Sequence, residues 1–247
     1  MQMQEKKVKG FSLLELLVVV SIIGILSAIS FQPFMNWRGD RAVRVEAQNI
    51  TSVIKDIFSQ VQRGQYSFVQ FDIQKSGNEY LISSNGMFID RFTDYVRDKY
   101  NASDQLNDFH KFTTRCSDSL TWDHIGETDE NILTVNQISV DASRVGIGVD
   151  GSDVSSDGGR VCFSKDGTYY SPGGIFLSGS TPIERLFICT VRSSGTGCSL
   201  GVNNEPPSDQ KNTFALEWSR FGNISLKKYS ESNGWIEPVS YTHLTLP

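Results

Sequence analysis

The sequence predicts an α+β fold in which one long N-terminal helix packs on a C-terminal, antiparallel, β-rich head domain. Three observations lead to this prediction. A nearly unbroken apolar run covers residues 11–29, apolar residues then recur at helical spacing over residues 43–61, and short β-rich segments separated by turns follow from residue 66 onward. A switch from helical to strand periodicity is typical of this fold class. We expect the helix to consist of a membrane-spanning half and an amphipathic half.

The composition indicates a folded body without a general attraction to nucleic acid. The 247 residues are 38% hydrophobic and 21% charged, and they carry a net charge of −5. In the first ten residues Lys6, Lys7 and Lys9 oppose only Glu5, so the rest of the chain is more acidic than the whole. DNA or RNA binding would therefore require a local basic patch.

The apolar run of residues 11–29 carries one carboxylate, Glu15, near its start. A helix of this length spans about 28 Å, close to the thickness of the hydrocarbon core of a membrane. A charge at mid-depth costs roughly 2.5–3.5 kcal/mol on insertion scales, so Glu15 needs a compensating interaction. An ordinary secretory signal peptide and a plain membrane anchor are the alternatives, although a glutamate inside the apolar core is unusual for a signal peptide.

The segment "KKVKG" followed by "FSLLELLVVVSIIGILSAI" resembles the signal of type IV pilins and type II secretion pseudopilins. The resemblance implies that a prepilin peptidase cleaves between Gly10 and Phe11 and that Phe11 becomes the N-methylated first residue. It also implies that Glu15 pairs with the terminal amine of a neighbouring subunit, since either charge alone is costly in low dielectric. Gly24 falls at a glycine position of the family, and Pro33 lies slightly beyond the position expected for the family's proline.

Five segments follow from this reading: a leader peptide at 1–10, a transmembrane helix at 11–32, an amphipathic helical half at 33–62, a periplasmic β-rich head at 63–238, and a suspect non-native tail at 239–247. We expect the helix to be interrupted near Pro33 and Gly39. In the amphipathic half the apolar residues form one stripe, which we expect to pack on a sheet. Its members are Val43, Ala47, Ile50, Ile54, Ile57 and Val61.

The remaining chain contains alternating apolar patterns that predict strands. "YSFVQFDI" and "EYLISS" flank the turn-rich "QKSGN" and predict a hairpin, while residues 87–100 return to helical spacing. Further strands are expected at residues 132–140 and 144–149, as a pair about an Asp166-Gly167 turn, in "ERLFICTV", and in "FALEWSRFGNISLKKY" with a turn near residues 221–223. Residues 88–132 resemble no segment of the pilin families and are interpreted as an insertion.

Residues 145–229 resemble the β-rich domain of H-type pseudopilins and FimT/FimU-type minor pilins, through "RVCFSKDG", "ERLFICTV" and "FALEWSRFGNISL". The resemblance implies a structural subunit that, before assembly, is anchored in the bacterial inner membrane with its head in the periplasm. It would then prime or join a type IV pilus or a type II secretion pseudopilus, and the residues do not distinguish the two. The implied partners are other pilin or pseudopilin subunits, the prepilin peptidase and inner-membrane lipid.

The four cysteines, Cys116, Cys162, Cys189 and Cys198, all follow the apolar run. An even number in an exported domain favours disulfides, and four cysteines allow three connectivities. The short glycine-containing loop in "CTVRSSGTGC" favours Cys189–Cys198, which leaves Cys116–Cys162. Four buried thiols are the alternative, and zinc is not expected without a C-x-x-C pair.

The motifs of common enzymes are missing from the sequence, so we expect neither an enzyme nor a cofactor. "GIGVDG" at residues 146–151 matches G-x-G-x-x-G, but "SDVSSDGG" follows it instead of a helix that could receive a phosphate. Asp150, Asp153 and Asp157 form an acidic loop with oxygen ligands suited to calcium. Because their spacing is not that of an EF-hand, we expect a solvated turn and no metal.

DNA binding is the alternative function, as in minor pilins that take up DNA for natural transformation. In those proteins basic residues lie near a C-terminal "GRxR" motif, and here the corresponding stretch reads "RFGNISLKKY". Arg220, Lys227 and Lys228 are the remaining candidates for phosphate contacts. Lys227 and Lys228 would point to opposite faces of a strand, which splits the patch, so a solvated hairpin is the preferred interpretation.

Overall fold

The fold is known from a computed structural model. The residues whose placement it describes are 12–90, 92–94, 116, 132–150, 152–154, 158–171, 174–178, 181–191, 198, 200, 205–206, 212–219 and 223–237, with side chains at 28–37 and 132–133 excepted. The chain divides into two compact units, Met1–Asp40 and Arg41–Pro247. The first unit contains the beginning of the long helix, and the second contains the rest of the helix and all the strands.

Helix α1 (Leu13–Arg63) continues through Pro33 and Gly39 as one element, so the predicted interruption is wrong. A proline removes one N–H donor and disturbs one turn, but the remaining hydrogen bonds can carry the helix past it. Among the residues that the structure describes, no helix is both long and apolar enough to qualify as a membrane span. The membrane-spanning half of the helix therefore stays a prediction.

The second part of α1 supplies one side of the main hydrophobic core. All six residues of the predicted stripe are at most 2% exposed, which confirms the stripe: Val43, Ala47, Ile50, Ile54, Ile57 and Val61. Val53, Thr51 and Gln60 are buried as well, so the buried arc of the helix is wider than the stripe. The reason is that the core contains side chains from two sheets, whereas the sequence suggested packing on one.

The first sheet has the strand order β3-β2-β1-β6-β7, and all neighbouring strands are antiparallel. Its strands are β1 (Phe68–Ser76), β2 (Glu79–Met87), β3 (Ile132–Asp141), β6 (Gly159–Ser164) and β7 (Gly167–Tyr170). β1 and β2 form the predicted hairpin, and Gly77 adopts a φ of 59° in the turn, which glycine does without steric cost.

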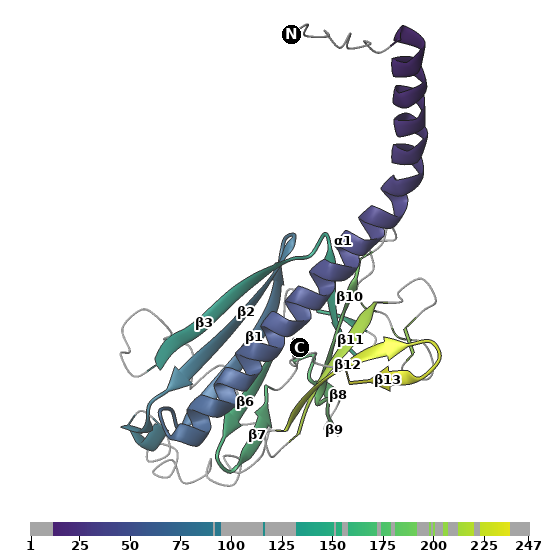
Figure 1. The fold of residues 1–247 in the computed structure, drawn as a ribbon. Helices are drawn as coiled ribbons and strands as arrows, with labels where there is room; N and C mark the ends of the chain where they lie inside the picture. The colour runs from purple at the N-terminus through teal and green to yellow at the C-terminus, as the bar shows by residue number, and fades with distance from the viewer. Residues whose placement is uncertain are drawn as a thin grey trace, which may run out of the picture. The chain divides into compact units, whose positions relative to one another are not determined.

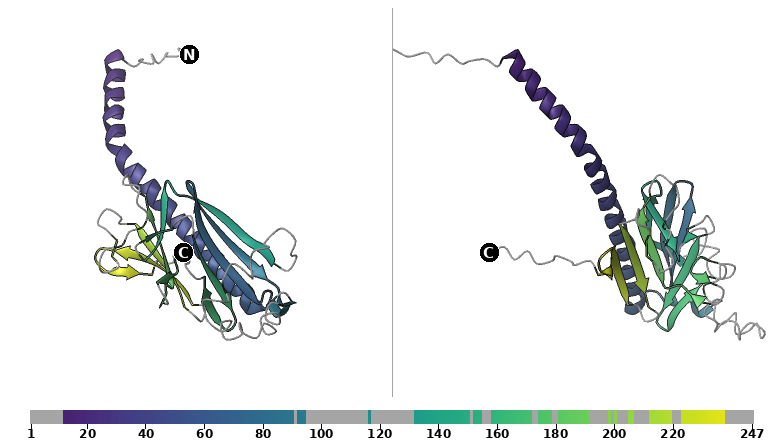
Figure 2. Two further views of the ribbon diagram at one scale, coloured as in Figure 1. Left: turned by 180° about the vertical axis from the view of Figure 1, so that it is seen from behind. Right: turned by 90° about the vertical axis from the view of Figure 1, so that its right-hand side faces the viewer.

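The second sheet has the strand order β13-β12-β11-β10-β4-β5 and is also antiparallel. Its strands are β4 (Val145–Val149), β5 (Ser152–Asp153), β10 (Arg185–Thr190), β11 (Thr213–Trp218), β12 (Ile224–Ser230) and β13 (Gly234–Ile236). β8 (Leu177–Ser178) and β9 (Thr181–Pro182) form a separate two-stranded ladder. Figures 1 and 2 show the second part of α1 lying against the two sheets. The antiparallel α+β prediction is thus confirmed for the head.

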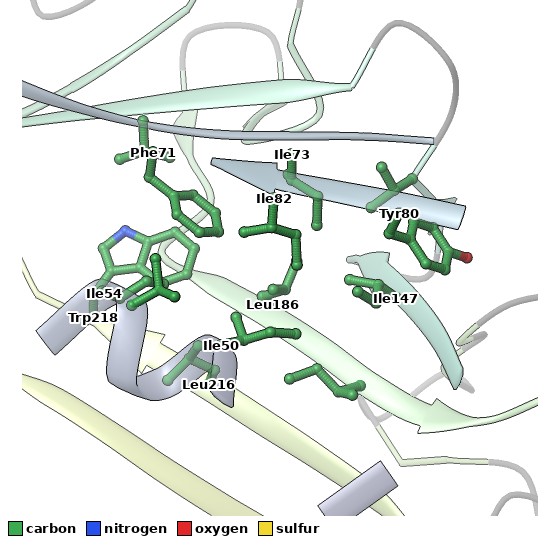
Figure 3. Packing of buried hydrophobic residues seen from close by; sticks show 14 of the residues in the cluster. Ile50, Ile54, Phe71, Ile73, Tyr80, Ile82, Ile147, Leu186, Leu216 and Trp218 are labelled. Carbon is green, nitrogen blue, oxygen red and sulfur yellow. The ribbon is translucent and has the colours of Figure 1, made fainter. Parts of the chain in front are cut away.

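The core lies where α1 and the two sheets meet. In Figure 3, Ile50 and Ile54 of α1 lie among side chains from both sheets. The first sheet contributes Phe71, Ile73, Tyr80 and Ile82, and the second contributes Ile147, Leu186, Leu216 and Trp218. Phe58 of α1 also contacts Phe163 of β6, with ring centroids 4.5 Å apart. The helix is therefore an integral part of the head's core.

Each sheet also carries a smaller apolar cluster outside this core. On the first sheet the cluster contains Phe68, Met87, Cys162 and Tyr169 together with Cys116, and Phe92 packs against it. On the second it contains Phe187, Cys189, Cys198 and Ala215, against which Leu200 and Trp235 pack. In both clusters a disulfide joins a strand to a residue from a connecting segment.

Three local predictions need correction. Met87 ends strand β2, so the helical turns expected at residues 87–100 begin later, at residues 89–90 and 92–94, and residues 95–100 lie outside the described chain. The turn between β6 and β7 consists of Lys165 and Asp166, while Gly167 already belongs to β7. The short strands β5, β8, β9 and β13 were not predicted, since two or three residues give no periodic signal.

Candidate functional site

The beginning of α1 places Glu15 in the first helical turn, directly after a capping residue. The Ser12 hydroxyl accepts a hydrogen bond from the Leu14 N–H at 3.3 Å, and the Ser12 carbonyl accepts the N–H groups of Glu15 and Leu16 at 3.0 and 3.1 Å. Ser12 therefore occupies the N-cap position, and Glu15 follows at the spacing of a capping box. A carboxylate at this end of a helix is stabilised by about 0.3–1 kcal/mol through the helix dipole. The structure thus gives Glu15 a local role that the sequence prediction did not consider.

The first part of α1 is apolar around its whole circumference and exposed in the isolated chain. Its large apolar side chains are 46–83% exposed: Leu13, Leu14, Leu16, Leu17, Val18, Val19, Val20, Ile22, Ile23, Ile25 and Leu26. We call these residues the apolar sleeve. The Ser21 hydroxyl donates to the Leu17 carbonyl at 2.8 Å, so it satisfies its donor within the helix. A helix that is hydrophobic all round is stable in apolar surroundings. Among the residues that the structure describes, none buries the sleeve.

The proposed processing residues Gly10 and Phe11 lie outside the described residues, so the structure places Glu15 but not the scissile bond. Gly24 lies within the sleeve, and a Cβ atom added to it would meet no other atom within 4 Å. Among the described residues, none packs closely enough against Gly24 to require a glycine.

The structure pairs Cys116 with Cys162 and Cys189 with Cys198, the two disulfides that the sequence favoured over four thiols. The Cα atoms are 5.6 Å apart in both pairs, within the usual range. All four cysteines are at most 1% exposed. The first disulfide ties the segment that contains Cys116 to strand β6, and the second ties Cys198 to strand β10.

The glycine pattern at residues 146–151 has a structural explanation. Gly146 and Gly148 lie in β4, and Asp150 begins the turn to β5 with a φ of 49°. A Cβ atom on Gly148 would lie 2.8 Å from the Cys198 carbonyl oxygen, so glycine leaves room for the disulfide loop. The described part of the match to G-x-G-x-x-G is therefore a strand followed by the first residue of a turn.

The two described carboxylates of the acidic loop, those of Asp150 and Asp153, do not converge on a common ligand position. Asp150 forms an ion pair with Arg185 of β10 at 2.8 Å, and Asp153 lies 4.0 Å from Lys75 of β1. Asp157 lies outside the described residues. Over the described part of the chain, no group of three histidine, cysteine or acidic residues has a metal-binding arrangement. The two described aspartates instead pair with basic side chains on neighbouring strands.

The two described members of the candidate basic patch, Lys227 and Lys228, lie next to each other on β12. Lys227 of β12 forms an ion pair with Glu217 of β11 at 2.6 Å, so its charge is locally compensated. Leu226 packs against the main core, and Lys228 shares its side of the strand. Arg220 lies outside the described residues.

A pocket of about 590 Å³ lies near the start of β10, and the sequence analysis did not foresee it. Its lining includes the carboxylates of Asp150, Glu184 and Glu217, together with Arg185. The remaining lining residues are Ser178, Thr181, Pro182, Ile183 and Trp218. These residues come from the β4–β5 turn, the β8–β9 ladder, the β9–β10 connection, β10 and β11, so only the tertiary fold brings them together.

One buried hydroxyl group helps to fix the wall of this pocket. The Tyr170 hydroxyl of β7 donates to the Glu184 carboxylate at 3.3 Å. The main-chain N–H of Trp218 donates to the main-chain carbonyl of Glu184 at 3.0 Å. Burial raises the pKa of Tyr170 and the Glu184 charge raises it further, so Tyr170 remains a neutral donor at physiological pH. Glu184 is therefore held by both its main chain and its side chain.

Comparison with known proteins identifies the N-terminus only. Residues 6–31 match the family model described as the prokaryotic N-terminal methylation motif. This match includes Gly10, Phe11 and Glu15, and it supports a type IV pilin-like protein that assembles with other pilin subunits. No curated protein and no solved structure shows significant similarity to the chain.

Proposed function

We propose that the protein is a structural subunit of a pilin-type filament: a minor pilin of a type IV pilus or an H-type minor pseudopilin of a type II secretion system. The methylation motif at residues 6–31 carries the proposal. A prepilin peptidase removes residues 1–10 by cleavage between Gly10 and Phe11 and methylates the new amine on Phe11. The protein then primes or joins the filament through its N-terminal helix.

The exposed apolar sleeve supports the proposal that the first part of α1 is a membrane anchor, whose surroundings change from lipid to protein during assembly. Its side chains expose a continuous apolar surface, and burial of such surface contributes roughly 25 cal/mol per Å². Before assembly, inner-membrane lipid would cover the sleeve, and in the filament the helices of neighbouring subunits would replace the lipid. The head would remain in the periplasm, an oxidising compartment in which its two disulfides are stable.

Glu15 has two candidate roles under this proposal. As an assembly residue it pairs its negative charge with the positive terminal amine of another subunit, which removes the cost of an unpaired charge in lipid. As part of a capping box it stabilises the first turn of α1 through its position after Ser12. Glutamine also serves at this capping-box position, so the substitution Glu15→Gln separates the charge from the cap.

The proposal is tested by mass spectrometry of the protein extracted from membranes of a host that contains a prepilin peptidase. We expect a chain that begins at Phe11 and carries one added methyl group on its amine. A Gly10→Leu variant is the control, and it should retain the complete leader. An intact leader in the wild-type protein, or a start at another residue, would rule out the proposed function.

A further inference from the structure

We propose that Asn223, in the sequence Asn223-Ile224-Ser225, is an acceptor for an N-linked glycan. The sequon N-x-S/T, in which x is not proline, marks such acceptors in secreted proteins. The chain contains this sequon at Asn49, Asn101 and Asn223, and Asn101 lies outside the described residues. The two remaining sequons have the same residue types but lie in different secondary structure. The inference goes beyond the proposed function and shares with it only the export of the head.

Asn223 ends the turn between β11 and β12, and it is exposed. Its main-chain N–H donates to the Ser219 hydroxyl at 3.1 Å, and its carbonyl accepts the Ser219 N–H at 2.9 Å. Among the residues that the structure describes, none forms a hydrogen bond with the Asn223 carboxamide. The backbone of this asparagine is therefore held in place, while its carboxamide stays accessible to an enzyme.

The other two residues of the sequon lie in the first part of β12. Ile224 packs against the main core, and Ser225 is partly exposed opposite Glu217 of β11. Because side chains alternate along an extended chain, we expect Asn223 and Ser225 to lie on one side and Ile224 on the other. An enzyme that reads the carboxamide and the hydroxyl together can then approach both from the same side.

The sequon at Asn49 lacks this arrangement because it lies in α1. Its carboxamide already donates to the Glu46 carboxylate at 3.2 Å. Thr51 is 6% exposed, and its hydroxyl donates to the Ala47 carbonyl at 2.6 Å. Two residues apart on a helix do not face each other. The fold therefore offers the Asn223 sequon to a transferase and withholds the Asn49 sequon.

The reaction is the transfer of an oligosaccharide from a lipid-linked donor of the polyprenyl diphosphate class. The Asn223 carboxamide nitrogen forms a bond to the C1 atom of the first sugar. The bond between C1 and the diphosphate oxygen breaks, and the lipid diphosphate leaves with the electron pair. The carboxamide nitrogen releases one proton to a base of the transferase, so no oxidant or reductant is needed.

The test incubates the folded full chain in detergent with an N-oligosaccharyltransferase and a lipid-linked oligosaccharide, and mass spectrometry of peptides locates the glycan. We expect a glycan at Asn223 that peptide-N-glycosidase removes, which leaves aspartate at this position. Asn223→Gln should lose this glycan. Ser225→Ala should lower the transfer rate at least about tenfold, because a site that hydrogen-bonds a hydroxyl rejects the analogue without it. Ser225→Thr keeps the hydroxyl and should keep the wild-type rate.

Asn49→Gln is the matched control, and transfer to Asn223 should be unchanged in this variant. A synthetic peptide of residues 220–228 verifies that the transferase accepts the sequence, so an unmodified Asn223 in the folded chain would overturn the proposal. Equal transfer to Asn49 and Asn223 would also overturn it, because the fold would then not select between the two sequons. The assay does not depend on leader removal, so its failure is distinguishable from a failure of the proposed function.

Discussion

The two parts of α1 have opposite surroundings although they belong to one helix. Leu17 in the apolar sleeve is 61% exposed, whereas Ile54 in the core stripe is fully buried. In the second part, apolar residues occupy the arc that faces the sheets, and charged residues such as Lys55 lie outside it. In the first part of α1, apolar residues occupy every side of the helix. The side chains of the core stripe are buried by the two sheets, whereas those of the sleeve remain exposed among the residues that the structure describes.

The largest expected effect comes from placing the same charge at three positions of this helix. Ile54→Asp buries an unpaired carboxylate in the core and should cost about 5 kcal/mol or more, enough to abolish cooperative unfolding. Val45→Asp, at a position 43% exposed, and Leu17→Asp, in the sleeve, should leave head unfolding within about 0.5 kcal/mol of wild type. Denaturant unfolding of the full chain in detergent measures all three. A large loss of unfolding free energy with Leu17→Asp would contradict the difference between the two parts of α1.

Removal of the disulfides should destabilise the head and leave the sleeve unaffected. Cys116 and Cys162 are 46 residues apart, and Cys189 and Cys198 are 9 apart. The loop-entropy relation predicts a loss of about 4 kcal/mol for a double serine variant of the first pair and about 3 kcal/mol for the second. Denaturant unfolding of each variant, with partitioning into membranes as the control, checks the prediction. Identical losses would contradict the entropic ordering.

The substitution Glu15→Gln tests the difference between the two parts of α1 at the N-terminal end of the helix. Since the first turn keeps its capping residue, we expect unchanged head unfolding and normal leader removal. Incorporation into filaments should fall at least about tenfold, because the partner's terminal amine is left without its counter-charge. Immunoblotting of sheared filaments against total protein measures incorporation. Normal incorporation of Glu15→Gln would leave the cap as the only role of this residue.

The smallest effect is expected at the surface turn between β3 and β4. The Asp141 carboxylate accepts the Ser143 hydroxyl and N–H at 2.5 and 2.9 Å, and these bonds lower the pKa of Asp141. A lowered folded-state pKa contributes stability above the unfolded value of about 3.9, and this contribution is lost as the pH falls through the folded value. Asp141→Asn should therefore lower the Tm slightly at pH 7 and not at pH 2. An equal difference at both pH values would exclude this origin.

The core stripe and the longer strands could be predicted because their burial is periodic in the sequence. Ile50 and Ile54 recur at helical spacing, and β1 and β10 form recognisable apolar segments. The contact of α1 with a second sheet could not be predicted, since the wider buried arc that includes Thr51 and Gln60 looks polar in the sequence. A buried polar residue is decided by its tertiary neighbours rather than by its own hydropathy.

The candidate sites also differ in whether they can be recognised from the sequence. Glu15 is recognisable because a carboxylate interrupts a local apolar run, a signal contained within a few residues. The pocket near the start of β10 is not recognisable, because Asp150, Glu184 and Glu217 are far apart in the chain and ordinary as single residues. Their common location depends on the antiparallel register that brings Arg185 opposite Glu217. A register of this kind follows from long-range pairing, which one sequence does not reveal.

The continuity of α1 from Leu13 to Arg63 has a mechanical consequence. From Arg41 onward the helix belongs to the same compact unit as the strands, so a pull on this part of the helix acts directly on the core stripe. To pull the helix out, residues such as Val43 and Val61 would have to slide past both sheets together instead of detaching one after another. A load shared in shear is resisted by all these contacts at once.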